Sequence, residues 1–309
     1  MSLIEKYQII VNSKVGLFKF MDIFSNEDEC LELYFWMQNE GKCCKKCGRS
    51  ICSNYSRVSR KDKNGTPKKA FKCKSCGTYI YPLSLTSFRG SSVPISTIFT
   101  TVFFTSCVGG SNSAVDAESI IGLSYKTCHR LMMQIRIAMK QDLSTKFNGV
   151  VEVDEAFFGG GSVHYNWSGI STRKKPVIGM LERGTGRVRM FLAEDRKAST
   201  IEKLIYANIE KGSTIYTDSW VGYEGLSEHY THEYVNHSNR EYVRGEVHTN
   251  GIEGVWGQLK RNIRKAHTKI SDKYVQQYID EACWKKNNSG LKSMQMFDKI
   301  IRSTFNPQP

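Results

Sequence analysis

Two Cys-x-x-Cys pairs constrain the fold of the first part of the chain more than any other feature. Each pair is followed directly by a glycine, which lets the backbone turn beneath a metal. One such turn presents two thiolates to a metal ion, and two turns complete a tetrahedral zinc site. We therefore expect a four-cysteine ribbon over residues 42–90, with a structural Zn²⁺ bound by Cys44, Cys47, Cys73 and Cys76.

The remaining cysteines leave alternatives open. Cys43 competes with Cys44 for the first ligand position, and the paired residues could instead be ordinary buried thiols. The chain has ten cysteines and no secretory signal at its start. In a reducing compartment, cysteine pairs bind metal more often than they form disulfides. We expect a protein of the bacterial cytoplasm or the eukaryotic nucleus, not a secreted one, and no apolar run reaches the roughly 18 residues of a membrane span.

The charge of the chain indicates a polyanionic partner. The net charge is +14, and residues 42–74 alone hold twelve Lys and Arg against one acid, Asp62, a net of +11. A basic block of this density favours nucleic acid over membrane, because no anchor or basic amphipathic helix lies nearby. The ribbon hairpin would carry Arg57, Arg60 and Lys61 toward DNA. The alternative is a solvated loop that aids solubility.

A helical segment precedes the ribbon. With 309 residues, the chain is long enough for two or three domains. Residues 1–41 contain one amphipathic helix, which Ser25 is expected to cap and Gly41 to end. We interpret this segment as a small packing domain without chemistry of its own.

A second helical region follows the ribbon over residues 91–147. A short helix at 112–121, a glycine-containing turn and a serine-capped helix at 124–139 form a pattern that resembles a helix-turn-helix. Lys126 and Arg130 would then be exposed to DNA. A plain helical bundle that links two domains explains the same pattern equally well.

From residue 148 onward the pattern changes to strands and helices. Three β-rich segments come first, then a helix, then two strands and two helices. In chain order the strands are 149–158, 176–181, 187–192, 213–217 and about 233–236, and the helices are 199–210, 248–260 and 272–286. A polar loop separates the first two strands. We expect one α/β domain over residues 148–309.

Acidic residues occupy selected positions in this domain. Asp154 lies in the first strand and Asp218 at the end of the fourth, so the two meet if these strands are neighbours. Glu253, on the following helix, would complete a three-acid cluster. Carboxylate oxygens suit Mg²⁺ or Mn²⁺, and two such ions can activate an attacking oxygen and stabilise a leaving one at phosphorus. Strand alternation makes Glu152 a minor rival ligand and directs Glu155 away.

The helix at 248–260 carries both an acid and a base. Glu253 and Lys260 are seven residues apart, two turns, and project from nearly one face. They could serve a metal and a phosphate together, or they could be ordinary solvated charges. Thr249 or Asn250 is expected to cap the start of this helix.

Three stretches of sequence carry a family resemblance. They are Val151-Glu-Val-Asp-Glu-Ala-Phe-Phe-Gly-Gly160, Tyr216-Thr-Asp-Ser-Trp-Val-Gly-Tyr223 and His248-Thr-Asn-Gly-Ile-Glu-Gly-Val-Trp-Gly-Gln-Leu-Lys260. These resemble the DDE transposases of the insertion-sequence 1595/1016 type, a group that includes the Merlin transposons. The resemblance covers roughly residues 148–288, and the four-cysteine ribbon is similar to the family's usual N-terminus. It implies an RNase H-like α/β catalytic core, a mixed sheet flanked by helices, preceded by a zinc ribbon and a small helical DNA-binding region.

The resemblance also implies a reaction. A DNA transposase of this kind would bind terminal repeats, cleave the transposon ends and join the 3′-hydroxyl to target DNA by two-metal-ion phosphoryl transfer. Asp154, Asp218 and Glu253 would then bind two Mg²⁺ or Mn²⁺ ions, and Lys260 would contact a DNA phosphate. Some relatives place asparagine as the third catalytic member, so Asn250 is the alternative to Glu253. We favour Glu253, because an ionised carboxylate binds Mg²⁺ better than an amide does.

The implied partner is double-stranded DNA, both the terminal inverted repeats and the target, with a homodimer or higher oligomer in the synaptic complex. Arg261 and Arg264 extend the basic edge at Lys260 and would track the DNA backbone. Trp220 and Tyr223 would stack on an unpaired base or pack in the core. Two alternatives stay open: a domesticated DNA-binding relative without strand transfer, and an RNase H-fold nuclease.

Overall fold

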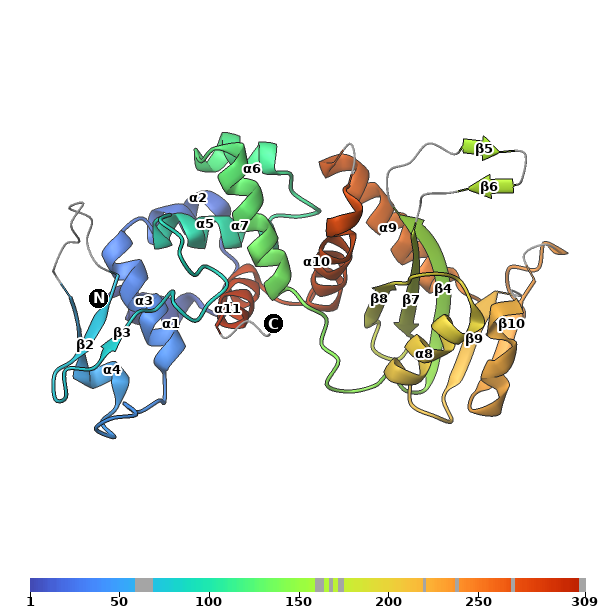
Figure 1. The fold of residues 1–309 in the computed structure, drawn as a ribbon, viewed down its shortest axis with the longest axis horizontal. Coiled ribbons are helices and arrows are strands. Elements are labelled where there is room, and N and C mark those ends of the chain that lie inside the picture. Colours follow the sequence, from blue (N-terminus) through green and yellow to red (C-terminus); the bar gives the residue numbers. More distant parts are fainter. Residues whose placement is uncertain are drawn as a thin grey trace. The chain divides into compact units, whose positions relative to one another are not determined.

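The computed structural model places the elements shown in Figure 1 and describes residues 1–58, 69–158, 164–166, 169–171, 175–218, 221–236, 239–267 and 270–305. The chain folds as two compact units, one formed by Met1–Ala138 with Leu291–Pro309 and the other by Met139–Gly290. The end of the expected α/β domain over residues 148–309, from Leu291 onward, therefore belongs to the first unit, and the second unit already begins at Met139. In the described residues, no helix combines the length and apolarity needed to cross a membrane.

Apolar helices build the core of the first unit. They are α1 (Leu3–Ile10), α2 (Leu17–Ile23), α3 (Glu27–Asn39), α5 (Ile95–Cys107) and α11 (Ser293–Ser303). Helix α11 is strongly amphipathic and buries Phe297 against Phe20, Phe24 and Phe99, with ring centroids 4.9–5.7 Å apart. These aromatic contacts explain why α11 packs here, although it follows the second unit in the sequence. Burial of its apolar face in this core stabilises the fold.

The ribbon consists of a short helix and a three-stranded antiparallel sheet. Helix α4 (Ile51–Asn54) leads into β1 (Tyr55–Arg57), which pairs with β2 (Phe71–Cys73), and β2 pairs with β3 (Tyr79–Ile80). Phe71 stacks on Phe35 of α3 at a centroid distance of 3.9 Å, which attaches the sheet to the helical core.

The cap of α3 differs from the expected one. Asn26, not Ser25, accepts hydrogen bonds from the first-turn amides. Asn26 directly precedes the helix, so its side-chain oxygen reaches the amides two and three residues further on.

Helices α6 (Ala114–Ile121) and α7 (Tyr125–Ala138) complete the first unit. Ser113 forms a capping box with Asp116, and Gly122 ends α6 in the left-handed region at φ 77°. Phe104 of α5 packs with Ala117 and Met132, so α5, α6 and α7 share one core. The predicted helix, glycine turn and helix are therefore present.

The second unit is built on a five-stranded mixed sheet. Its strands are β4 (Val150–Phe158), β7 (Lys175–Glu182), β8 (Val188–Leu192), β9 (Thr214–Asp218) and β10 (Thr231–Val235), in the order β10-β9-β4-β7-β8. β4, β7 and β8 form an antiparallel meander, whereas β9 pairs with β4 in parallel and β10 with β9 in parallel. This arrangement agrees with the RNase H-like core that the resemblance implies.

Helices cover both faces of this sheet (Figure 1). α8 (Ala198–Asn208) packs on the face that carries Val151 and Val153, and α9 (Asn250–Ala266) with α10 (Val275–Asn287) on the face that carries Ala156 and Phe158. The alternation of β4 side chains between the two cores follows from the two-residue period of a strand. It places the even-numbered acids of β4 on the α9 side.

Short elements occupy the connections. β5 (His164–Asn166) and β6 (Gly169–Ser171) pair antiparallel within the segment that we had expected to be a plain loop. The 3₁₀ helix η1 (Val221–Glu228) follows β9. A second one, η3 (Asp272–Tyr274), directly precedes α10.

Candidate active site

The pairing of β4 with β9 brings two of the expected acids together. The parallel register sets Val151 opposite Ile215 and Glu152 opposite Tyr216. Two residues further along the two strands come Asp154 and Asp218, so both carboxylates occupy the same end of neighbouring strands. The sequence condition for their meeting, that the first and fourth strands are neighbours, is confirmed.

Asp154 lies in a partly buried, negatively charged environment. Burial is the largest cause that raises its pKa, from 3.8 to about 7, and the charges of Glu155, Asp218 and Glu253 raise the pKa further. One oxygen, Oδ2, accepts a hydrogen bond of 3.1 Å from the indole Nε1–H of Trp256 on α9. The charges of Asp218 and Glu253 therefore both act on Asp154 at this edge of the sheet.

Glu253 reaches this edge from the first turn of α9. Its Oε1 accepts a hydrogen bond of 3.3 Å from the hydroxyl of Thr249. Thr249 holds the position before the helix but its side chain caps no backbone amide, and Asn250 is the exposed first residue of α9. Neither residue caps the helix in the way we had expected.

The cap comes instead from the neighbouring strand. The buried Glu152 side chain, in a residue that is 1% exposed, accepts a hydrogen bond of 2.9 Å through Oε2 from the backbone N–H of Ile252. Its Oε1 accepts one of 2.7 Å from Arg183 Nε, and Arg183 donates in turn to the carbonyl oxygen of His248 at 2.9 Å. A carboxylate at a helix N-terminus is favourable for both the unpaired amides and the helix dipole. Glu152 thus anchors the start of α9 to β4, immediately beside Glu253.

Two glycines permit this close approach of α9 to the sheet. A Cβ atom at Gly179 would lie 2.3 Å from Cζ2 of Trp256, and one at Gly251 would lie 2.5 Å from Leu181 and 2.8 Å from Oε2 of Glu152. Any larger residue would displace the indole or the helix start. The glycines consequently help to fix where Glu253 stands relative to Asp154.

The opposite side of β4 carries a different set of contacts. Glu155 forms an ion pair with Arg196 and accepts a hydrogen bond of 2.5 Å from the hydroxyl of Tyr223. It therefore points away from the α9 side, as strand alternation predicts. Tyr223 is fully buried in the core, so it offers no surface to a base, and Trp220 lies outside the described residues.

The basic residues of α9 follow its acidic start. Lys260 is half-buried, with its Nζ 5.9 Å from the centroid of the Phe158 ring, whereas Arg261 and Arg264 are exposed. Because Lys260 lies two turns after Glu253, it shares that side of the helix. Helix α9 therefore carries a cation on the same side as Glu253, two turns further along.

The four expected cysteines of the ribbon converge. In the described parts of the chain they are the one group of three or more metal-ligating side chains whose donor atoms all lie within 4.8 Å of one another. The Sγ atoms of Cys44 and Cys76, and those of Cys47 and Cys73, are 3.7 Å apart. Four sulfurs at the Zn–S distance of about 2.3 Å in a tetrahedron would be roughly 3.8 Å apart. Cys43 is exposed and outside this group, so Cys44 holds the first position of the cluster.

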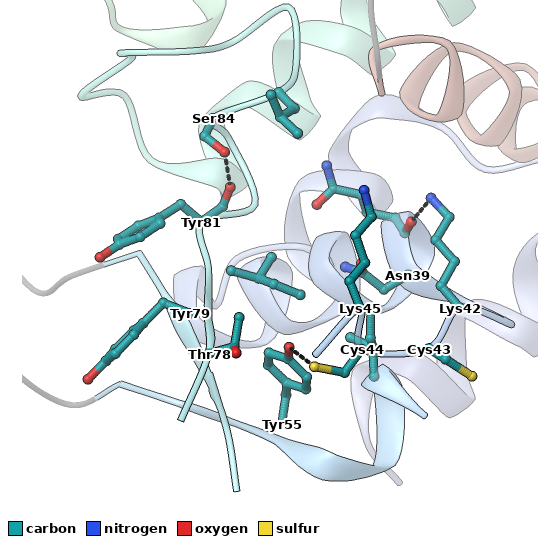
Figure 2. Close-up of a pocket in the computed structure, with 14 residues that line it drawn as sticks. Asn39, Lys42, Cys43, Cys44, Lys45, Tyr55, Thr78, Tyr79, Tyr81 and Ser84 are labelled. Atoms are coloured by element: carbon teal, nitrogen blue, oxygen red, sulfur yellow. Dashed lines mark hydrogen bonds between the residues drawn. The ribbon is translucent and has the colours of Figure 1, made fainter. Parts of the chain in front are cut away.

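Hydrogen bonds to the sulfurs favour the thiolate form. The Tyr55 hydroxyl donates to Cys44 Sγ at 3.2 Å (Figure 2) and lowers the pKa of that thiol to about 6, helped by the amides of the Cys-x-x-Cys turn. Asn54 Nδ2 donates to Cys73 Sγ at 3.1 Å. Because metals bind the thiolate, these contacts favour the metal-binding form of Cys44 and Cys73, whereas burial and the neighbouring sulfurs raise the pKa of Cys47 to about 11.

The other expected DNA contacts are dispersed over the first unit. Arg57 pairs with Asp28 at 2.6 Å, and Arg60 and Lys61 lie outside the described residues. Lys126 and Arg130 are exposed on the first turns of α7, and Arg130 donates to Gln134 at 3.2 Å. Their exposure agrees with the predicted helix-turn-helix surface, whose DNA contacts stay a prediction.

Sequence reasoning missed the roles of Glu152, Arg183 and Trp256. Strand alternation did place Glu152 on the side of Asp154, but only as a rival ligand. Arg183 comes from the turn after β7, and nothing local in the sequence links it to Glu152. The spacing of Trp256, three residues after Glu253, was the available signal for an aromatic donor beside the acids.

Comparison with known proteins finds relatives of this chain among transposase-like proteins. The ISXO2-like transposase domain matches residues 146–287. An uncharacterized protein in the transposable element ISH50 of Halobacterium salinarum is 30% identical over 223 residues, which cover 67% of this chain and 74% of that protein. An uncharacterized transposase-like protein of Haemophilus influenzae is 24% identical over 121 residues, 38% of this chain and 97% of that protein.

Among solved structures, the catalytic core domain of the HTLV-2 integrase in complex with magnesium is similar to part of the chain. The TM-score is 0.27 and the identity 14%, over 45% of this chain and 85% of that chain. A similarity of this size carries no weight for the function of the present protein.

Proposed function

The chain belongs to the DDE transposases of the insertion-sequence 1595 type, and we propose that it cleaves the ends of a DNA transposon and joins the freed 3′-hydroxyl to target DNA. The observation that supports this proposal is the parallel pairing of β4 with β9, which puts Asp154 and Asp218 at the same end of neighbouring strands, where burial and the charges of Glu155, Asp218 and Glu253 raise the pKa of Asp154. Like charges rarely gather in a partly buried place unless a function requires them. The transposase family supplies that function.

The three carboxylates have the chemistry of a divalent-cation site, although their donor atoms are not among the described groups that lie within 4.8 Å of one another. They are hard oxygen donors, and their mutual repulsion would be relieved by positive charge. When bound there, Mg²⁺ or Mn²⁺ would lower the pKa of a water or hydroxyl nucleophile and stabilise the leaving oxygen at phosphorus. We assign Asp154, Asp218 and Glu253 as the ligands, with Asn250 as the alternative third residue.

The other residues of the site position these ligands and the DNA. The Trp256 indole fixes one oxygen of Asp154, and Glu152 with Arg183 fixes the start of α9, which carries Glu253. Lys260 would bind a DNA phosphate two turns along α9 from Glu253. Fixed ligands matter because a displacement of about 1 Å costs on the order of 100-fold in rate.

The first unit would recognise the transposon ends. Its four-cysteine cluster would bind Zn²⁺ as a structural ion, since four thiolates leave no open position. Its basic surface, including Arg57, Lys126 and Arg130, would contact the DNA backbone of the terminal repeats, and a dimer or higher oligomer would hold two ends together.

A strand-joining assay tests the proposal. Purified protein, Mg²⁺ and a labelled DNA fragment carrying a terminal repeat are expected to give both end cleavage and joined product. Asp154→Ala, Asp218→Ala and Glu253→Ala each remove one ligand and are expected to lower both by at least about 100-fold. Asn250→Ala, on the same turn of α9, tests the alternative third ligand and is expected to leave both products at the wild-type level.

Each alternative gives a distinct outcome in the same assay. Cleavage without joined product would identify a nuclease of the same fold. Binding of the repeat without either reaction would identify a DNA-binding relative. Joining by Glu253→Ala at the wild-type rate, with loss in Asn250→Ala, would transfer the third position to Asn250.

A further inference from the structure

Two adjoining hollows on the surface of the first unit share the residues Tyr81 and Ser84. The first, of about 460 Å³, is formed by the end of α3, the first Cys-x-x-Cys turn and the segment around β3. The second, of about 470 Å³, is formed by residues 81–91 of the chain together with Lys69. Tyr81 and Ser84 line both hollows, so the two meet along one edge of the ribbon.

Exposed aromatic rings form the centre of this surface. Tyr79 and Tyr81 are 44% and 52% exposed, and the adjacent Leu85 is 68% exposed. The two tyrosine rings have centroids 6.4 Å apart and planes only 19° from parallel. Their spacing of two residues places them on one side of the backbone, as Figure 2 shows. Lys72 Nζ lies 5.6 Å from the Tyr79 ring centroid and adds a cation to one ring.

Positive charges line both hollows. Lys42 and Lys45 line the first hollow; in Figure 2 they lie on the other side of the segment that carries Tyr79 and Tyr81, whose rings point away from them. Lys69 and Arg89 line the second hollow, where Lys69 also pairs with Glu27 at 3.4 Å. No aspartate or glutamate is among the described residues that line either hollow. The surface is therefore complementary to a chain of phosphates.

We propose that this surface, Lys42 and Lys45 with Tyr79, Tyr81 and Arg89, binds an unpaired stretch of a DNA strand. Bases stack on the tyrosine rings, while the lysines and Arg89 hold the phosphates on either side. Basic residues alone would serve a duplex equally well, but the bases of a duplex already stack on one another and gain nothing from exposed rings. Exposed aromatic rings on a positively charged surface are the pattern of single-strand binding sites. The proposal rests on the proposed function, which makes DNA the partner.

Fluorescence anisotropy with a labelled oligothymidylate of about 12 nucleotides tests this surface, since single-strand sites span roughly 4–16 nucleotides. The measurement uses the full chain with Asp154→Asn and no added divalent metal, so that no DNA is cleaved. Tyr79→Ala and Tyr81→Ala are each expected to weaken binding by roughly 5- to 100-fold, the effect of losing one stacked base. Lys45→Gln should lower the slope of log affinity against log salt concentration by about 0.7.

Two variants and one measurement serve as controls. Tyr81→Phe keeps the ring face and is expected to bind like the parent, and Tyr242→Ala removes an exposed tyrosine of the second unit and should change nothing. Zinc content equal to that of the parent shows that each ribbon variant is folded.

Unchanged single-strand affinity in both alanine variants would overturn the proposal. So would an equal loss of affinity for a blunt duplex of the same length, which would make the surface a duplex contact. Because binding is measured on a catalytically silent protein, failure here leaves the strand-joining result untouched, and failure of strand joining leaves this binding result readable.

Discussion

Replacement of Asp154 by asparagine is expected to stabilise the metal-free protein while it abolishes activity. The carboxyl has its pKa raised from 3.8 to about 7, mainly by burial and then by neighbouring negative charges. Each unit of pKa difference between the folded and unfolded states is worth about 1.36 kcal/mol. The ionised Asp154 therefore costs the folded state at most about 4 kcal/mol. The amide introduced by Asp154→Asn would keep an oxygen for the Trp256 N–H but carry no charge.

The expected gain is smaller than this ceiling, because Asp154 is only partly buried and its surroundings relax around the charge. We expect the free energy of unfolding to rise by about 1–3 kcal/mol at about pH 8. At roughly 2–4 °C per kcal/mol for a unit of this size, the melting temperature should rise by about 2–12 °C.

The sign of the pH dependence follows from the raised pKa. Between about pH 4 and 7 the folded protein keeps a proton on Asp154 that the unfolded chain has already lost, so the stability of the wild type falls as pH rises. Below about pH 4 both states are protonated and the cost is absent. The difference between Asp154→Asn and wild type should thus be small at about pH 4 and below, grow steadily as the pH rises, and be nearly complete above about pH 7.

Urea unfolding at four pH values between about 4 and 8, without added divalent metal, measures this difference. Glu210→Gln, an exposed acid before the opposite end of β9, is the matched control and should show no pH-dependent gain. Addition of Mg²⁺ should stabilise the wild type, by about 2.7 kcal/mol at about 100 times the dissociation constant, but not Asp154→Asn. A difference that is constant across pH, or a destabilised Asp154→Asn, would refute the reasoning.

Three further predictions concern the surroundings of the acids and the ribbon. Glu152→Gln should lose about 1–3 kcal/mol of unfolding free energy, because Arg183 loses its ionic partner. Glu152→Gln should also weaken Mn²⁺ binding in titration calorimetry, because Glu152 positions Glu253. If the same substitution weakens Mn²⁺ binding equally when Glu253 is already replaced by glutamine, Glu152 does not act through Glu253. Gly179→Ala should lower the urea midpoint by the equivalent of about 1–3 kcal/mol through its clash with Trp256, whereas Gly184→Ala, where nothing lies within 4 Å, should not; equal midpoints would show that the indole can move freely. Cys73→Ser should lose zinc in elemental analysis, whereas Cys43→Ser should retain it, and unchanged zinc in Cys73→Ser would exclude the four-thiolate site.

The sequence allowed the sheet of the second unit to be predicted in most of its strands. β4, β7, β8 and β9 carry strong patterns of branched and aromatic residues, and the pairing of β4 with β9 confirmed that Asp154 and Asp218 stand on neighbouring strands. The positions of these two acids could be predicted because the alternation of side chains along a strand, and the point where the strand ends, depend on neighbouring residues in the sequence. The four-cysteine cluster was accessible for the same reason, since each Cys-x-x-Cys turn is local.

The features that escaped prediction depend on contacts between distant residues. Glu152 meets Ile252 at a sequence separation of 100 positions, and Arg183 joins them from a third element. Helix α11 has a strong amphipathic pattern, but periodicity cannot tell which core a helix will cover, and the aromatic cluster around Phe297 decides it. A local cap for α9 was expected, and a distant strand supplies it instead.

The position of bound metal tests the central assignment most directly. Crystals soaked in Mn²⁺, with diffraction recorded at the manganese absorption edge, locate the ion through its anomalous signal. The assignment predicts a peak within roughly 2.2 Å of carboxylate oxygens of both Asp154 and Asp218, with Glu253 bound to this ion or to a second one about 3.5–4 Å away. A peak that is held by Glu152 or Glu155 and leaves Asp154 and Asp218 uncoordinated would contradict it.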